Sequence, residues 1–191
     1  MSLPVRQIRA VFTASTITVY QAFPAAIGIP AARTGRFPTA FDRERMTWIK
    51  PSFHWMMYRS DWGRAPGQER VLALEITREG FEWAIARAVE SSYRPRLHPS
   101  RDAWRRELRR GEVRVQWDPE RDAALRPLPW RALQVGLRGE AVRRYADEWL
   151  VSVSDVTALA GEVHRGGGRG APVELPYPLP EPVAAAIGAT G

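Results

Sequence analysis

The chain has 191 residues, the length of one ordinary domain of about 100 to 200 residues, which excludes a large multidomain enzyme. Hydrophobic residues at 45% and charged residues at 26% exclude a disordered chain, and the absence of cysteine excludes disulfide scaffolds, thiolate zinc sites and cysteine nucleophiles. A formal net charge of +7 favours polyanionic partners, either DNA or RNA or a phosphate-bearing cofactor.

The first half of the chain predicts short strands and helices separated by turns. Alternating β-branched and apolar residues predict a strand at 16–20, and a short helix around Pro30 follows at 25–32. Segments 46–49 and 53–58 are predicted as strands or buried apolar segments, with Pro51 leaving Lys50 at a bend between them. An apolar strand at 71–76 then leads, through Thr77 as N-cap, into a helix over about 79–90.

The second half continues the same mixture. A polar helix is predicted at 101–110, with Gly111 ending it. Three strands and two helices complete the pattern: strands at 113–117, 131–137 and 149–153, and helices at 140–147 and 155–163. The sequence therefore predicts an α+β fold over residues 1–164, with a mainly antiparallel sheet, continuous or split, flanked by short helices. Residues 165–191 are rich in glycine and proline and are predicted as a flexible tail.

No apolar run approaches the roughly 18 residues of a membrane helix, and the first residues lack the apolar core of a signal peptide. We therefore expect a cytoplasmic protein without a membrane partner. The sequence leaves the oligomeric state open.

The block from Arg45 to Ser60 begins Arg-Met-Thr-Trp-Ile-Lys-Pro-Ser-Phe and resembles the signature of a bacterial and fungal family of domains of unknown function, numbered four-two-nine-one. Other segments resemble the same family; they are 6–10, 19–22, 67–73, 134–137 and 147–149. The resemblance runs from about Arg6 to Val163 and leaves the tail outside. It implies a family and no particular activity.

A second resemblance concerns architecture. The order of an opening strand ending in Tyr20-Gln21, a helix, a strand region rich in hydroxyl and aromatic groups and a later strand near an acidic residue is similar to that of small ADP-ribosyltransferase domains. The resemblance implies that NAD lies in a cleft between two short sheets, held by an early basic residue and a hydroxyl or aromatic group. Arg6 or Arg9 would supply the basic residue here.

The Arg45 block also carries the side chains of a nucleotide site. Lys50 is the only lysine among 28 Lys and Arg residues, which suggests a need for a compact point charge. Cations and flat rings together can hold phosphates and a base, although most of the aromatic residues are expected in the core. The predicted cofactor-binding residues are Arg6, Arg9, Tyr20, Gln21, Thr47, Trp48, Ser52, Tyr58, Arg59 and Ser60.

Group transfer from NAD also needs a carboxylate to stabilise positive charge or to activate the acceptor. The candidates are Glu69, Glu75, Asp118, Glu120, Glu140 and Glu148. Glu75, within an apolar strand, and Glu140, at a helix start, are the leading choices beside Lys50 as catalytic residues. His54, His98 and His164 lack zinc-ligand spacing, and no metal site is predicted.

Arg101, Arg105 and Arg109 fall on one face of the predicted helix at 101–110, where they can bind a nucleic-acid backbone or form an ordinary solvated face. Two hypotheses follow. The protein is an NAD-using, ADP-ribosyltransferase-like enzyme acting on nucleic acid or another polyanion, or it is a non-catalytic nucleic-acid-binding module that uses the same arginines and aromatic residues.

Overall fold

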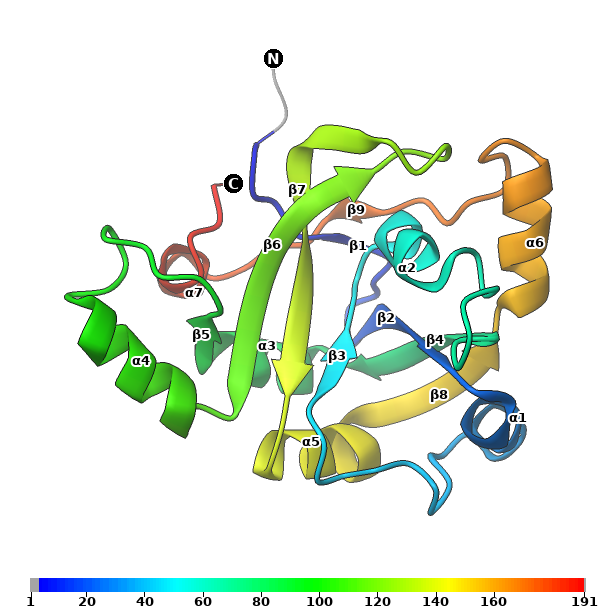
Figure 1. Ribbon diagram of the computed structural model, residues 1–191, viewed down its shortest axis with the longest axis horizontal. Coiled ribbons are helices and arrows are strands. Elements are labelled where there is room, and N and C mark those ends of the chain that lie inside the picture. The colour runs from blue at the N-terminus through cyan, green and yellow to red at the C-terminus, as the bar shows by residue number, and fades with distance from the viewer. Residues whose placement is uncertain (1–3, 191) are drawn as a thin grey trace.

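Two sheets form the centre of the protein, and they cross between layers of short helices (Figure 1). The computed structural model describes residues 4–190. The three-stranded sheet has the order β2 (Thr16–Phe23), β4 (Arg70–Thr77) and β8 (Leu150–Asp155), with both pairs antiparallel. The four-stranded sheet has the order β3 (Thr47–Ile49), β7 (Pro127–Leu137), β6 (Val113–Arg121) and β5 (Ala88–Glu90), and only β5 pairs in parallel. The predicted α+β fold with a split, mainly antiparallel sheet is confirmed.

The two sheets are joined at Tyr20 and Lys50. The Tyr20 N–H donates to the Lys50 carbonyl oxygen over 2.7 Å, and the Lys50 N–H donates to the Tyr20 carbonyl oxygen over 3.2 Å. Because Pro51 follows directly and cannot donate to a ladder, the pairing stops after this bridge. Lys50 therefore lies at the junction of the two sheets.

The helices lie around the sheets and several begin at side-chain caps. Their bounds are α1 (Ala25–Thr34), α2 (Phe53–Ser60), α3 (Arg78–Ala86), α4 (Arg101–Arg110), α5 (Glu140–Arg144), the π-helical turn η1 (Tyr145–Trp149), α6 (Thr157–Arg165) and α7 (Glu181–Ala186). Ser52, Thr77 and Ser100 each accept a hydrogen bond from a backbone N–H of the first helical turn. Across residues 4–190, no helix has the length and apolarity needed to cross a membrane.

The structure decides one local alternative and corrects another prediction. Segment 53–58, expected as a strand or a buried apolar segment, belongs to helix α2, whose Phe53, Met56 and Met57 are buried together at helical spacing. The helix predicted to reach residue 90 ends at Ala86, and residues 88–90 form β5 beside β6. In both places the local pattern is compatible with either helix or strand, and packing against residues far away in the chain decides between them.

The hydrophobic core has two parts. The larger part lies between the sheets and α3, where alternate residues of β4 such as Leu72, Leu74 and Ile76 are fully buried. The smaller part holds Phe53 and Met57 of α2 against the three-stranded sheet and α6. This second cluster fixes α2, and therefore Arg59 near its end, relative to the sheet junction.

The segment after residue 164 contributes to the core, whereas the sequence predicted a flexible tail. Strand β9 (Leu175–Pro176) pairs antiparallel with β1 (Arg9–Ala10). Tyr177 and Ile187 are buried in the larger core, and Trp117 Nε1 donates to the Ile187 carbonyl oxygen over 2.8 Å. Glycine and proline content predicted flexibility here, but a few large side chains are enough to anchor a segment against an existing core. The packed domain therefore extends past the predicted boundary.

Candidate functional site

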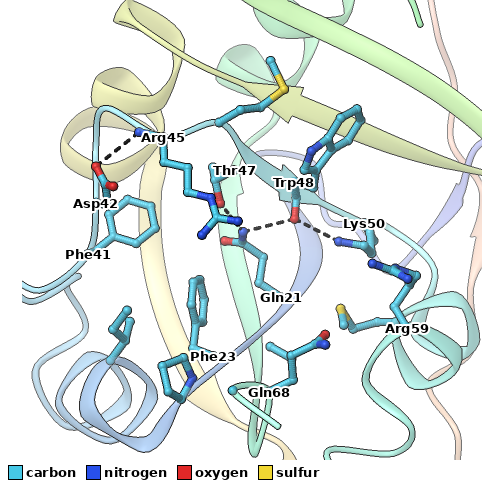
Figure 2. Close-up of a pocket in the computed structure, with 16 residues that line it drawn as sticks. Gln21, Phe23, Phe41, Asp42, Arg45, Thr47, Trp48, Lys50, Arg59 and Gln68 are labelled. Atoms are coloured by element: carbon cyan, nitrogen blue, oxygen red, sulfur yellow. Dashed lines mark hydrogen bonds between the residues drawn. The ribbon is translucent and has the colours of Figure 1, made fainter. Parts of the chain in front are cut away.

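A cleft with two lobes lies at the junction of the sheets. The first lobe, a cavity of about 450 Å³, lies between β2, β3 and residues 41–46; the second, of about 480 Å³, lies over β6 and β7 beside α2. Trp48, Lys50 and Arg59 line both lobes, so we describe them together as the Lys50 cleft. Figure 2 shows the first lobe, with Lys50 and Arg59 side by side at one end.

Lys50 is the most buried of the cations that line the cleft, since Arg45 and Arg59 are exposed. Its side chain is 7% exposed, and Nζ donates to the Trp48 carbonyl oxygen over 3.1 Å. Among residues 4–190, no salt bridge joins Nζ to a carboxylate. Burial, reinforced by the positive charge of Arg59 and opposed by Asp118, lowers the pKa of Lys50 to about 7. A large share of the amine is therefore uncharged at neutral pH.

Asp118 supplies a carboxylate to the second lobe. Its Oδ1 accepts from Gln116 Nε2 over 2.8 Å, and its Oδ2 accepts from Gln134 Nε2 over 2.7 Å. All three residues line the second lobe with Lys50. Gln116 and Asp118 alternate with buried residues of β6, and Gln116 lies opposite Gln134 in the β6–β7 register. The two amides therefore fix the orientation of the carboxylate toward the lobe.

The two carboxylates favoured by the sequence lie outside the cleft. Glu75 lines neither cavity and accepts from Ser152 Oγ over 2.9 Å on the neighbouring strand. Glu140 is exposed at the start of α5 and pairs with Arg144 over 2.8 Å. Asp118, which the sequence ranked below them, takes their place in the cleft. The local sequence does not distinguish Asp118 from Glu75 and Glu140, because only the packing of strands and helices decides which carboxylate lines the cleft.

Gln21, Thr47 and Trp48 do line the cleft, as expected, but much of their polarity is used internally. Gln21 Nε2 donates to Thr47 Oγ1 over 2.6 Å and to the Trp48 carbonyl oxygen over 3.1 Å (Figure 2). The Gln21 Oε1 atom accepts from the Tyr145 hydroxyl over 2.7 Å. These bonds hold β2, β3 and η1 together. A Cβ at Gly136 would lie 3.0 Å from the Trp48 ring, so glycine there gives the indole room to lie against β7.

An aromatic rim borders the second lobe. The rings of Trp55 and Tyr58 stack with centroids 5.1 Å apart at an interplanar angle of 25°. The Arg121 guanidinium lies 3.7 Å from the centroid of the Tyr58 ring, and Tyr58 remains 40% exposed. The sequence did not predict Arg121 at the site, because this residue lies beyond the strand predicted at 113–117. Its contact with Tyr58 of α2 joins segments that are far apart in the chain.

The remaining cofactor-binding candidates line neither cavity. Ser52 caps α2, and the Ser60 hydroxyl donates to the Met56 carbonyl oxygen, so both serve the helix. Tyr20 is buried against Phe53, with its ring centroid 5.5 Å away, and burial raises its pKa.

The two early arginines also lie elsewhere. Arg6 forms a salt bridge with Glu90 at 3.4 Å, far along the four-stranded sheet, and lies over the Trp117 ring. Arg9 donates to Gln7 and to the Glu174 carbonyl oxygen. Neither takes the position in the cleft that the resemblance to ADP-ribosyltransferases assigned to an early basic residue. Arg45 and Arg59, which line the first lobe, are the guanidinium groups that the structure provides there.

Two buried carboxylates surround the N-terminus of α2. Glu174 Oε1 accepts from the Phe53 N–H over 2.6 Å, and Glu120 Oε1 accepts from Ser52 Oγ over 2.9 Å. Burial raises the pKa of Glu174 to about 8, with the charge of Glu120 adding to the effect, and burial also raises the pKa of Glu120. We call Glu120 and Glu174 the carboxylate pair. The sequence missed the role of Glu174 because it lies in the predicted tail.

Helix α4 carries the three arginines predicted to bind nucleic acid, and none of its residues is buried. Arg105 pairs with Asp102 at 3.4 Å, and the Arg101 guanidinium lies 4.8 Å from the Tyr93 ring centroid. Figure 1 places α4 at the opposite edge of the molecule from α1. Arg101, Arg105 and Arg109 therefore form a surface separate from the Lys50 cleft.

Among residues 4–190, no group of three or more histidine, aspartate or glutamate side chains is arranged to hold a metal ion. The site is thus defined by an amine, guanidinium groups and amides, with the carboxylate of Asp42 in the first lobe and that of Asp118 in the second. Over residues 7–176 the chain matches the family described as Domain of unknown function (DUF4291), and it belongs to that family. The match extends beyond Val163 and includes β9, so part of the predicted tail lies within the family domain. A search of curated proteins finds no match.

Proposed function

We propose that the protein is an NAD-using transferase, similar to ADP-ribosyltransferases, that modifies nucleic acid or another polyanion in the Lys50 cleft. The observation that carries the proposal is the convergence of Lys50, Arg59 and Asp118 on one cleft between two sheets. Lobes of about 450 and 480 Å³ fall in the size range of small-molecule sites.

The proposal gives each group a role. Arg45 and Arg59 hold the pyrophosphate, since guanidinium groups bind phosphate oxygens in pairs. Trp48, which lines both lobes, offers a flat surface for a base or for nicotinamide. Asp118 stabilises positive charge at the ribose as the bond to nicotinamide breaks.

The transfer step balances with these groups alone. The bond between ribose C1′ and the nicotinamide nitrogen breaks, and nicotinamide leaves with the bonding electrons. A bond forms between C1′ and an oxygen or nitrogen of the acceptor. The acceptor's proton passes to the uncharged Lys50 amine, whose pKa of about 7 suits a general base at neutral pH.

The polyanionic acceptor fits the charge of the molecule. The net charge is +7, and the exposed arginines of α4 can bind phosphates away from the cleft. An acceptor that contacts both surfaces would be an extended chain such as DNA or RNA.

The rim favours a second candidate function, a non-catalytic nucleic-acid-binding module. Trp55, the partly exposed Tyr58 and Arg121 form a stacked surface that can hold a base without any reaction. This function needs no carboxylate in the cleft.

The test is incubation of the full chain with labelled NAD and separate pools of DNA, RNA and protein. The transferase predicts label in one pool and its loss in Lys50→Met, which removes the amine while filling a similar volume. Glu75→Gln, outside the cleft, is the matched control and should keep the activity. No label in any pool, together with salt-dependent binding to nucleic acid, would overturn the transferase in favour of the binding module.

A further inference from the structure

The Lys50 amine is placed as a nucleophile as well as a base. We propose that Lys50 forms an imine with a phosphate-bearing sugar aldehyde bound in the Lys50 cleft. This activity needs no NAD and therefore goes beyond the proposed function.

The surroundings of Nζ leave the amine available. It makes one hydrogen bond, to the Trp48 carbonyl oxygen, and it borders both lobes. The charged groups that face it are Arg59 from α2 and Asp118 from β6, and Arg45 lines the same first lobe. A lysine that is desolvated and close to another cation is the usual arrangement for imine formation, because both effects favour the neutral amine. The lowered pKa of Lys50 agrees with this geometry.

The reaction is balanced without an added oxidant or reductant. The Nζ lone pair forms a bond to the carbonyl carbon, and a proton passes from the nitrogen to the carbonyl oxygen to give a carbinolamine. A second proton, taken from solvent, lets that oxygen leave as water while the nitrogen lone pair forms the C=N bond, which leaves a protonated imine. Asp118 stabilises the positive charge of the imine nitrogen, as it stabilises the protonated amine of Lys50 before the aldehyde binds.

The lining of the cleft selects the class of aldehyde. Arg59, which lines both lobes, provides a guanidinium for a phosphate. Gln116, Gln134 and Asp118 line the second lobe with amide and carboxylate groups that suit sugar hydroxyls. These groups bond to one another, but an apolar aldehyde would exclude water from their remaining hydrogen-bonding positions and from Arg59 without replacing it, which is costly.

The chain offers an internal control for the experiment. Lys50 is the only lysine of the sequence, so the internal reference is the N-terminal α-amino group of the protein used, a kind of amine whose ordinary pKa is about 7.7 to 8.0. The full chain is incubated at pH 7.5 with ribose 5-phosphate and cyanoborohydride, which reduces the imine to a stable amine. Peptide mass spectrometry then measures the adduct at each of the two amines.

We expect the adduct at Lys50 to form at least about tenfold faster than at the α-amino group, since the two amines have similar basicity and only one has a binding site. Arg59→Gln should slow labelling by ribose 5-phosphate more than labelling by uncharged glyceraldehyde, because loss of the Arg59 charge makes the Lys50 amine more basic toward both sugars but removes a phosphate ligand from only one. Inorganic phosphate should compete only against the phosphorylated sugar.

Equal rates at the two amines in the folded protein would overturn the proposal. Labelling of Lys50 that is indifferent to phosphate and to Arg59→Gln would overturn the substrate class. Since NAD is absent, a negative result here leaves the NAD-transfer assay to decide the proposed function separately, and the reverse also holds.

Discussion

The carboxylate pair at the N-terminus of α2 and the Lys50 cleft beside the same helix both hold ionisable groups that burial shifts toward the uncharged form. The pKa of Lys50 falls to about 7, and that of Glu174 rises to about 8. The half-buried Glu174 accepts a hydrogen bond from the Phe53 N–H, whereas Lys50 borders both lobes of the cleft. Desolvation therefore raises the pKa of a carboxylate that caps a helix in one place, and it lowers the pKa of an amine that faces a cavity in the other.

The two sites also oppose each other in the pH dependence of folding. Glu174 has a folded pKa above its ordinary value of 4.5, so its contribution to stability is full below pH 4.5 and is lost as the pH rises through about 8. Lys50 has a folded pKa below its ordinary value of 10.5, so its contribution is full above pH 10.5 and is lost as the pH falls through about 7.

The largest expected effect concerns the chemistry of the Lys50 cleft. Asp118→Asn should lower NAD-dependent label transfer by about 100-fold or more, because it removes the carboxylate that stabilises positive charge at the ribose. Glu75→Gln and Glu140→Gln should stay within about twofold, since both carboxylates lie outside the cleft. Initial rates of transfer measure this. Equal losses in all three variants would remove the distinction between Asp118 and the other acids.

The second prediction concerns the segment that carries Glu174. Ile187→Ala should reduce the free energy of unfolding by about 2–5 kcal/mol, because Ile187 is fully buried in the larger core. Val173→Ala, at a side chain that is 79% exposed, should change it by less than about 0.5 kcal/mol. Urea unfolding gives both values. A stable Ile187→Ala protein would show that the tail is not anchored to the domain.

The third prediction separates the two buried sites by pH. Glu174→Gln should flatten the fall in Tm between pH 4.5 and about 8, because the variant has no proton to lose in that window. Lys50→Met should instead flatten the change between about pH 7 and 10.5. Glu181→Gln, at an exposed carboxylate of the same segment, is the control. Identical Tm profiles for wild type and Glu174→Gln would contradict the assignment.

The smallest expected effect concerns α4. Replacing Arg105 and Arg109 by glutamine should reduce the salt dependence of nucleic-acid binding by about 0.9 for each phosphate that the helix no longer neutralises. Arg33→Gln on α1 also removes an exposed arginine and should leave the slope unchanged. Measurement of affinity against salt concentration tests this. A slope that changes equally in both variants would indicate a general charge effect and not a docking surface on α4.

Local patterns predicted much of the fold and part of the site. Helix α4 begins and ends where the sequence placed it, because Ser100 caps it and Gly111 follows it. The Arg45 block contains Trp48, Lys50 and Arg59, which are close in the chain and line both lobes of the cleft. Local patterns did not predict the helix at α2 or the strand at β5, because both are stabilised by packing against segments that are distant in the chain.

The sequence by itself determined that the chain folds as an α+β domain, the order of most elements, the family and the position of the single lysine. Only the tertiary structure decided that Asp118, and neither Glu75 nor Glu140, enters the cleft, and that Glu174 and Ile187 anchor the last segment. The physical reason is that burial and strand register set which charges meet, and both depend on residues far apart in the chain.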